Sequence, residues 1–288
     1  MPPLDWLSQL TQPLPAPPLF LEQWTWPELA ELQARGVTTV LLPIGATEQH
    51  GPHLPFNTDT IIATSCCAYA SALTGVPILP TLPITVSLGH TEKWPGTLSL
   101  YPETLIAMVR EIAHWCFATG WTRLVIVNAH CGNDAALRVA VDRLRFDLVG
   151  QLSVATRNTW NLTPEIAAAF TADAQDWHAN QAETDLMLFL APHTVRRDAL
   201  PTAADPDRTA GCIFPWMVPH TSRNGVTGAP GIGNSTHGEL LLTQIGTALA
   251  TCVTKAQTEA PPLAWSRTTS AFGPLRAPSE SSLILPQT

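Results

Sequence analysis

The sequence predicts an α/β fold with a mainly parallel central sheet covered by helices. Short runs rich in β-branched and other apolar residues alternate with longer stretches of helical periodicity, which is the order typical of strand–helix–strand units. Several of the short runs are almost wholly apolar, as expected of strands buried on both faces. With 288 residues, 45% of them apolar and only 13% charged, the chain can bury a large core.

The first predicted elements begin at residue 26. Residues 26–35 have the pattern of a short helix ended by Gly36, and residues 37–44 form an apolar strand. Residues 60–73 have helical length and a helix-compatible composition, and residues 76–80 follow as a short strand. The strand at 37–44 therefore leads directly into a polar loop.

The later elements repeat this alternation. A proline in the first turn and Gly120 beyond the end predict a helix over 102–119. Apolar spacing predicts further strands over 124–127 and 152–156 and further helices over 135–148, 182–190 and 239–253.

We expect one domain, over residues 25–258, between two proline-rich ends. The N-terminal arm, residues 1–24, and the C-terminal tail, residues 259–288, have the composition of segments that lack regular hydrogen bonding. We expect them to wrap over the domain or over a neighbouring subunit. The low charge content also favours a surface partly covered by further copies, which predicts a homo-oligomer.

Composition excludes several classes of partner and site. The net charge is −8 and no segment clusters lysine and arginine, which argues against nucleic acid and anionic membranes as partners. The start of the chain lacks an export signal and no window is apolar enough to span a membrane, so we expect a soluble cytoplasmic protein. The six cysteines show no CxxC spacing, which favours buried free thiols over disulfides or a zinc finger.

The loop after the first strand has the composition of a metal site. Residues 45–59 contain Glu48, His50 and Asp59, and an irregular loop can aim carboxylate and imidazole ligands at one point. Asp59 also stands where the next helix begins, so a role as its N-cap is the alternative. We expect His53, in the same loop, to support the ligands rather than to bind an ion.

A second histidine follows a second strand. His130 comes shortly after the strand at 124–127 and precedes a glycine-containing turn into a helix. Ligands of parallel sheets bind beyond the carboxyl ends of the strands, so His130 and the Glu48 loop are expected at the same edge. A lone histidine there is more often structural, but the pairing with the first loop favours a ligand. The adjacent Cys131 allows a Cys/His nucleophile, which we rank low because neighbouring side chains on a turn usually point apart.

Three further segments have the composition of a substrate site. His178 and Glu183 are five residues apart, so they converge only if His178 precedes the helix that carries Glu183; a solvated glutamate and a capping histidine are the alternative. The loop at 89–97 is suited to closing over a small polar substrate. The glycine-rich segment at 224–233 lacks the strand and helix context of a dinucleotide site.

Four of these segments, in this order, resemble the signatures of the creatininase family: residues 45–59, 90–97, 128–133 and 178–184. With residues 225–239, the resemblance runs through most of residues 25–255. It implies a three-layer α/β/α sandwich, a hexameric assembly and two divalent metal ions, zinc or manganese, with iron as the alternative.

The resemblance also implies roles for individual residues. Glu48 and His130 would bind one ion, His50 the other, and Asp59 would bridge them. Creatininase has a metal-binding glutamate where this chain has Gly132, so Glu183 becomes the candidate that completes the shell. His178 resembles the proton-transferring histidine of the family. We expect His90, Trp94, Thr97 and Trp177 to contact substrate.

These features predict a metal-dependent amidohydrolase that cleaves a C–N bond of a small amide or cyclic amide. Two ions that share a carboxylate can activate water and polarise the carbonyl group, Glu183 can orient the attacking water, and His178 can protonate the leaving nitrogen. Because of the glycine at 132, a formamide deformylase or a small-peptide peptidase is an alternative within the same family. A non-catalytic metal- or ligand-binding protein is the alternative of another class.

Overall fold

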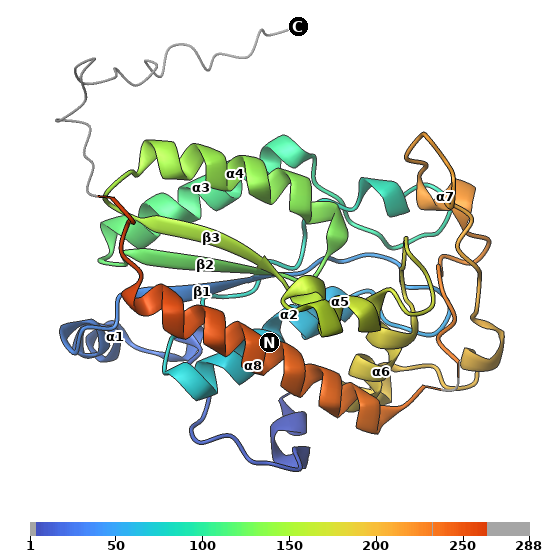
Figure 1. The fold of residues 1–288 in the computed structure, drawn as a ribbon, viewed down its shortest axis with the longest axis horizontal. Helices are drawn as coiled ribbons and strands as arrows, with labels where there is room; N and C mark the ends of the chain where they lie inside the picture. Colours follow the sequence, from blue (N-terminus) through green and yellow to red (C-terminus); the bar gives the residue numbers. More distant parts are fainter. Residues whose placement is uncertain (1–3, 232, 264–288) are drawn as a thin grey trace, which may run out of the picture.

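A computed structural model describes residues 4–231 and 233–263 of the chain and has three layers (Figure 1). Three parallel strands, β1 (Thr39–Ile44), β2 (Arg123–Asn128) and β3 (Ser153–Asn158), form the central sheet in the order β1-β2-β3. Helices α3 (Pro102–Ala118) and α4 (Asp134–Asp147) cover one face. Helices α2 (Thr58–Thr74), α6 (Gln181–Leu190) and α8 (Ser235–Thr258) cover the other. The predicted α/β/α sandwich is confirmed.

Alternation along the strands explains the two helical layers. Leu42 of β1 and Ile126 of β2 belong to the core shared with α3 and α4. Their neighbours Leu41 and Val125 belong to the core shared with α2, α6 and α8. Successive side chains of a strand point to opposite faces, so strands covered on both sides must be apolar throughout.

The predicted strand at 76–80 is reduced to a short pairing. Ile78 forms isolated parallel bridges with Leu41 and with Phe20. Pro77 and Pro80 flank it and cannot donate backbone hydrogen bonds, which limits a longer ladder. The pairing nevertheless extends the sheet on the β1 side and brings the N-terminal segment beside it.

The proline-rich N-terminal segment packs on its own chain. The side chain of Trp6 is fully buried and that of Phe20 nearly so, and both belong to the core formed with α2, α6 and α8. Short 3-10 turns over Asp5–Gln9 and Leu21–Gln23 lead into α1 (Trp26–Ala34). Most of the predicted C-terminal tail, from residue 264 onward, lies outside the described residues.

Two short helices were not predicted. Helix α5 (Pro164–Phe170) follows an N-cap, Thr163, whose side chain accepts a hydrogen bond from the backbone of Ile166. Helix α7 (Val218–Thr221) lies in a long segment between α6 and α8. Both lie toward the end of the molecule where the strands terminate (Figure 1).

Parallel register brings the strand ends together. Ile44, Asn128 and Asn158 are paired across the three strands, so the loops that follow β1 and β2 begin side by side at the same edge of the sheet. The sequence places both of its acid-and-histidine loops at this edge.

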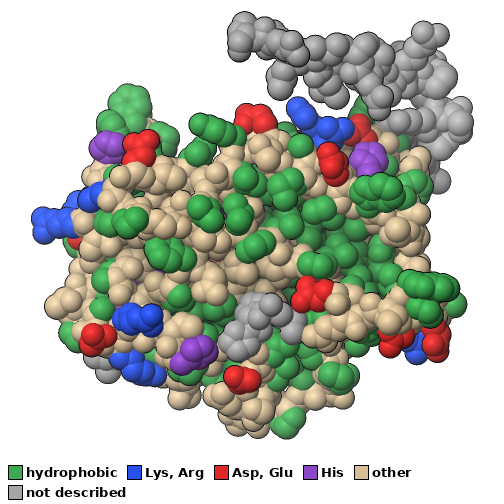
Figure 2. Space-filling model, turned by 180° about the vertical axis from the view of Figure 1, so that it is seen from behind, with side chains coloured by type: hydrophobic (Ala, Val, Ile, Leu, Met, Phe, Trp, Pro, Cys, Tyr) green, Lys and Arg blue, Asp and Glu red, His purple; other side chains and the backbone are tan. Residues whose placement is uncertain are grey.

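The surface carries few charged side chains. Viewed from behind, hydrophobic side chains are spread over much of the face, and charged side chains lie mostly near its margins (Figure 2). Across residues 4–231 and 233–263, no helix combines the length and apolarity that crossing a membrane requires.

Candidate active site

The loop after β1 turns back on the start of α2. Gly45 is packed so closely that an added Cβ would lie 2.5 Å from the backbone of Thr60. The backbone N–H of Glu48 donates to the carbonyl oxygen of Phe56 at 3.0 Å, which closes the loop. Helix α2 begins at Thr58, so Asp59 lies in its first turn and is not its N-cap. Glu48, His50 and Asp59 are therefore brought to one buried point.

The loop after β2 is held against the first loop by Asn133. Its amide nitrogen donates to the carbonyl oxygen of Gly45 at 3.0 Å, and its amide oxygen accepts from the backbone of Val86 at 3.1 Å. The side chain of Asn128 accepts from the backbone N–H of His130 at 3.1 Å. This network fixes His130 beside the Glu48 loop, as the strand-end argument predicted.

The third segment satisfies the condition that His178 precedes its helix. His178 and Thr227 exchange two backbone hydrogen bonds of 3.0 and 2.8 Å. The chain then turns at Ala179, which has a φ of 49°, and α6 begins at Gln181. Asn180 caps this helix by accepting from the backbone N–H of Glu183 at 3.3 Å. His178 and Glu183 consequently reach the same cavity.

The side chains from the three segments form two groups that share Asp59. His130 Nδ1 lies 3.3 Å from Glu48 Oε1 and 3.4 Å from Asp59 Oδ2. His50 Nε2 lies 3.2 Å from Asp59 Oδ1 and 3.7 Å from Glu183 Oε1. All five residues are buried, and each group offers three ligand atoms close enough to hold one ion. Glu48, His50 and His178 form a third set of this kind.

Hydrogen bonds to backbone carbonyls fix which ring nitrogens are free. His130 Nε2 lies 2.8 Å from the carbonyl oxygen of Val86 and His50 Nδ1 lies 3.1 Å from that of Glu48, so these nitrogens carry the protons. The lone pairs of His130 Nδ1 and His50 Nε2 then face carboxylate oxygens. Such a contact is repulsive unless a proton or a cation lies between the atoms.

Several carboxylate oxygens at this point are buried and unpartnered. Among the described residues, both oxygens of Glu48, Oδ2 of Asp59 and Oε2 of Glu183 have no hydrogen-bond partner. A buried charged oxygen without a partner lowers the stability of a protein by about 1–3 kcal/mol or more for each group. The donor set of carboxylates and imidazoles is the one that zinc and manganese prefer, so the residues fit two divalent ions.

The pKa shifts express the same crowding of acids. Burial raises the pKa of Glu48 to about 7, and the nearby charge of Asp59 adds to this effect. Burial lowers the pKa of His50, but Asp59 and Glu183 outweigh it and hold that pKa well above its ordinary value. Burial is thus the main cause of the shift at Glu48, and a cation among these side chains would favour the charged carboxylate.

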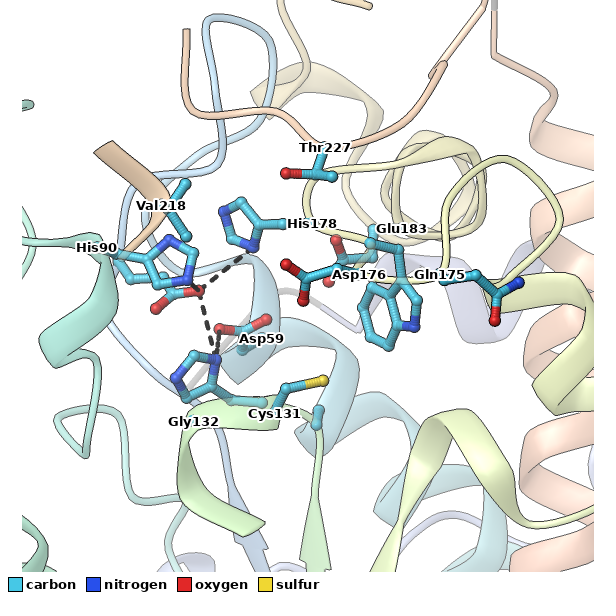
Figure 3. Close-up of a pocket in the computed structure, with 14 residues that line it drawn as sticks. Asp59, His90, Cys131, Gly132, Gln175, Asp176, His178, Glu183, Val218 and Thr227 are labelled. Atoms are coloured by element: carbon cyan, nitrogen blue, oxygen red, sulfur yellow. Dashed lines mark ion pairs between the residues drawn. The ribbon is translucent and has the colours of Figure 1, made fainter. Parts of the chain in front are cut away.

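A pocket of about 130 Å³ opens onto the cluster. In Figure 3, Asp59, His90, His178 and Glu183 point toward its centre. Its lining combines ligand candidates with further residues: Glu48, Asp59, His90, Ala129, His130, Cys131, Gly132, Gln175, Asp176, Trp177, His178, Glu183, Val218 and Thr227.

The structure divides the four predicted substrate contacts. His90 and Trp177 line the pocket, whereas Trp94 and Thr97 do not. The hydroxyl of Thr97 accepts from the backbone of Gln49 at 3.0 Å and donates to the carbonyl oxygen of His90 at 3.3 Å. Thr97 therefore joins two loops. The ring of Trp94 instead contacts its neighbour, with its centroid 4.6 Å from the ammonium group of Lys93. Both residues lie outside the pocket lining, and their contact with substrate stays a prediction.

His53 and Cys131 were also considered from the sequence, and the structure places both near the cluster. His53 binds Thr184 through Nε2 at 2.9 Å, which matches a supporting role next to Glu183. Cys131 lines the pocket although an adjacent side chain was expected to point away from that of His130. The Cys131 side chain is exposed at the pocket, yet desolvation by the surrounding atoms and the neighbouring carboxylates raise the pKa of its thiol well above the ordinary value, so the thiolate needed for nucleophilic attack is disfavoured.

Four lining residues were not predicted. Gln175 and Asp176 directly precede Trp177, and their position next to a predicted motif was a usable signal. Val218 comes from the long segment before α8, which has no periodic pattern that would place it over the site. Thr227 lies in the same segment, within residues 225–239 of the family resemblance.

Gly132 lies in the turn after His130 with little space around it. A Cβ at this position would lie 2.5 Å from the carbonyl oxygen of Val86 and 2.5 Å from His130 Nε2. The backbone conformation that orients His130 therefore leaves no room for a side chain here. Glu183, from α6, supplies a carboxylate to the cluster instead.

Comparisons with known proteins agree with this geometry. Residues 22–253 match the family model described as creatinine amidohydrolase. A creatinine amidohydrolase of Pseudomonas putida is 28% identical over 241 residues, which cover 78% of this chain and 92% of that protein. A mycofactocin precursor peptide peptidase of Mycolicibacterium smegmatis is 31% identical over 220 residues, which cover 73% of this chain and 81% of the relative.

Solved structures agree as well. A structure named "Creatininase Mn" has a TM-score of 0.71, and a glutamate-to-glutamine mutant creatininase of the "Zn-Zn type" has a TM-score of 0.72. Both are 26% identical to this chain, cover 84% of it, and are themselves covered over 100% and 99% of their length. The family model, the relatives and the fold agree, and the chain belongs to the creatinine amidohydrolase family.

Proposed function

We propose that this chain is a metal-dependent amidohydrolase that cleaves a C–N bond of a small amide or cyclic amide. The observation that carries the proposal is the position of Asp59 between two imidazoles. One oxygen faces the lone pair of His50 at 3.2 Å and the other faces that of His130 at 3.4 Å. Two cations held by these side chains would share Asp59 as a ligand.

The two groups of side chains define how the ions would be held. Glu48, Asp59 and His130 would hold one ion, and His50, Asp59 and Glu183 would hold the other. Zinc and manganese are the favoured metals because solved relatives are named for these forms, with iron as the alternative. When bound, the ions lower the pKa of a water molecule toward ~7 and polarise an amide carbonyl.

His178 is placed to move the proton. Its Nε2 lies 2.7 Å from the carbonyl oxygen of Gln49, so this nitrogen carries the proton and Nδ1 is free. Nδ1 lies 3.5 Å from Glu48 Oε1, at the edge of the pocket. His178 would take a proton at Nδ1 from the attacking water and pass it to the leaving nitrogen, which would otherwise depart as a poor anion.

Glu183 and Trp177 complete the site from the α6 side. The buried Glu183 would bind metal through one oxygen and orient the attacking water with Oε2, which has no partner among the described residues. Trp177 lines the pocket and packs against Phe170, with ring centroids 4.8 Å apart. This packing gives the substrate a rigid apolar wall that limits access of bulk water.

Two substrate classes are supported by the relatives. The Pseudomonas putida protein is named for creatinine, a cyclic amide, which favours hydrolysis of a small cyclic amide. The curated relatives above 30% identity are named as peptide peptidases, which favours a peptide bond as the alternative. A formamide remains the third candidate within the same chemistry. The glycine at 132, without the side chain that creatininase has there, leaves the substrate open among these three.

One screen separates the candidates. Full-length protein loaded with Mn²⁺ or Zn²⁺ is incubated with creatinine, N-formyl amines and short peptides, and products are identified by mass spectrometry. We expect turnover of one class, loss of turnover with a chelator, and loss of both metal and turnover in His50→Ala and Asp59→Asn. Metal and activity retained in both variants would contradict the proposal. Tight metal retention without turnover of any amide would support a non-catalytic metal-binding protein.

We further propose that the chain assembles into a homo-oligomer, a hexamer by family resemblance, in the cytoplasm. Large apolar side chains such as Trp26, Tyr101 and Trp115 are mostly exposed in the single chain, and the surface carries few charges. Contact with further copies would cover such side chains. Light scattering coupled to size exclusion gives the mass directly, and a monomer at micromolar concentration would contradict this expectation.

A further inference from the structure

The side chain of Gln49 lies between two histidines at the pocket. It is buried, and its amide nitrogen lies 3.0 Å from His90 Nδ1 and 3.3 Å from His178 Nε2. The same nitrogen lies 3.2 Å from the carbonyl oxygen of Gly225. Gln49 sits between Glu48 and His50 in sequence, but its side chain points to a different group of residues.

The orientation of the carboxamide follows from its other end. The backbone N–H of Gly51 donates to Gln49 Oε1 at 2.9 Å, so the oxygen faces Gly51 and the NH₂ group faces the histidines. One amide proton is donated to Gly225 and the other to His90 Nδ1. A nitrogen that accepts a hydrogen bond carries a lone pair, so the proton of neutral His90 is on Nε2.

The backbone of the same residue sets the other ring. His178 Nε2 donates to the carbonyl oxygen of Gln49 at 2.7 Å, which leaves the lone pair on Nδ1. The 3.3 Å contact between His178 Nε2 and the Gln49 amide nitrogen is then a contact of two donors whose protons are used elsewhere. The two rings lie side by side, with centroids 4.2 Å apart. His90 presents an N–H donor and His178 presents a lone pair to the same part of the pocket.

The surroundings are shaped for this carboxamide. Gly225 has a φ of 88°, and a Cβ there would collide with the Gln49 side chain. The backbone N–H of Gln49 donates to the hydroxyl of Thr97, which donates to the carbonyl oxygen of His90. Loops from three parts of the chain are therefore tied to one residue.

We propose that Gln49 is a positioning residue that makes His90 a hydrogen-bond donor, while its backbone makes His178 an acceptor, at adjacent points of the pocket. His90 Nε2 and His178 Nδ1 lie 3.7 and 3.5 Å from the same oxygen, Glu48 Oε1. This inference rests on the proposed function, in which the carbonyl oxygen of the substrate gains negative charge as water loses a proton. The N–H of His90 stabilises the developing oxyanion, and the lone pair of His178 receives the proton.

Nitrogen NMR of the full-length, zinc-loaded protein tests the proton positions without any substrate. With ¹⁵N-histidine, we expect both His90 and His178 to be protonated at Nε2. In Gln49→Glu an oxygen replaces the NH₂ group, so His90 should become protonated at Nδ1. His178 should not change, because its partner is the backbone carbonyl, and it serves as an internal control. A wild-type His90 protonated at Nδ1, or a His90 that is unchanged in this variant, would overturn the proposal.

Kinetics test whether the donor matters for catalysis. Gln49→Met keeps the length of the side chain and removes the amide; loss of a residue that orients a catalytic ring commonly costs about 10–100-fold, and we expect this loss in kcat with unchanged metal content. In His90→Gln the hydrogen-bond donor does not depend on a tautomer, since the NH₂ group of the glutamine replaces the ring N–H. Gln49→Met should therefore cost much less in the His90→Gln background than in the wild type.

The outcomes separate this inference from the proposed function. An equal loss in both backgrounds, with unchanged melting temperature, would show that Gln49 acts only on the fold of the loop and would overturn the inference. If the metal-loaded wild type hydrolyses no amide, the proposed function fails. The NMR result then still decides whether Gln49 sets the proton position of His90.

Discussion

His50 Nε2 and Asp59 Oδ1 lie 3.2 Å apart in the interior, and the proton of that ring belongs to the other nitrogen, which lies 3.1 Å from the carbonyl oxygen of Glu48. When this ring is neutral, a lone pair thus faces a carboxylate oxygen at hydrogen-bond distance. The contact is favourable only with a proton or a metal ion between the two atoms. A metal ion is the natural occupant of this position.

Asp59→Asn should remove metal-dependent stability. A ligand that binds only the folded state at 100 times its Kd stabilises it by about 2.7 kcal/mol. We expect Mn²⁺ or Zn²⁺ to raise the melting temperature of the wild type and a chelator to reverse the rise, with neither effect in Asp59→Asn. Differential scanning calorimetry measures both. Asp142→Asn is the matched control, because the side chain of Asp142 is largely exposed and pairs with Arg145.

Glu183→Gln should weaken one ion of the pair. Glu183 Oε1 belongs to the group with His50 and Asp59, whereas Glu48 and His130 hold the other position. Metal content of the purified variant, measured by plasma mass spectrometry, should therefore fall from two ions per chain toward one. Glu165→Gln, on the exposed side of α5, should leave it unchanged. Full occupancy in Glu183→Gln would contradict the assignment of Glu183 as a metal ligand.

His178→Ala should reduce turnover more than it reduces binding. General acid–base catalysis contributes about 10²–10⁴-fold, so we expect kcat to fall within this range while KM changes little. Steady-state kinetics on the substrate found in the screen measures this split. His114→Ala, at an exposed position on α3, is the control. Loss of metal in His178→Ala would instead place His178 among the ligands.

Acid should destabilise the segment around Asp205. This buried carboxylate accepts from Arg208, from the hydroxyl of Ser222 and from the backbone of Arg223, and the bonds from Arg208 contribute most to lowering its pKa from 3.8 to about 2. A pKa that is lower in the folded state gives stability that is present above about pH 4 and is lost as the pH falls toward 2.

Asp205→Asn should remove this pH dependence. At neutral pH we expect a loss of about 1–2 kcal/mol in the free energy of unfolding, reduced from the full shift because Arg208 is partly exposed. As the pH falls to about 2 and below, the variant and the wild type should converge. Urea unfolding at a series of pH values checks both points, and a constant difference between the two proteins would contradict the role of this charge.

Gly132→Ala should disturb His130. Its Cβ would lie 2.5 Å from the carbonyl oxygen that accepts from the ring of His130. Overpacking of this kind costs about 1–3 kcal/mol, and we expect a lower melting temperature and weaker metal retention. Gly89→Ala is the control, since a Cβ there meets nothing within 4 Å. An unaffected Gly132→Ala would mean that the turn relaxes easily and that a glutamate is tolerated there.

Strand periodicity was sufficient to predict how the site is assembled. The apolar runs that became β1 and β2 are parallel neighbours, so their polar continuations had to meet at one edge of the sheet. The convergence of His178 and Glu183 was predictable as a condition, that the histidine precede the helix, and α6 begins at Gln181. The run at 76–80 was less informative, because its prolines limit pairing to Ile78.

The parts of the site that were not predicted depend on contacts between distant segments. Gln49 lies inside a predicted motif, but its partners, His90 and Gly225, are 41 and 176 residues away. Trp94 lies in a loop with the composition of a substrate site, yet its side chain is not part of the pocket lining. Helix α5 is a different case, because a threonine before a proline is a usable helix-start signal that was overlooked.

Anomalous diffraction from crystals of the Mn²⁺-loaded protein tests the central claim most directly. The account predicts two peaks, one among Glu48, Asp59 and His130 and one among His50, Asp59 and Glu183, with Asp59 contacting both. Manganese bound elsewhere on the chain, with these five side chains free of metal, would contradict it.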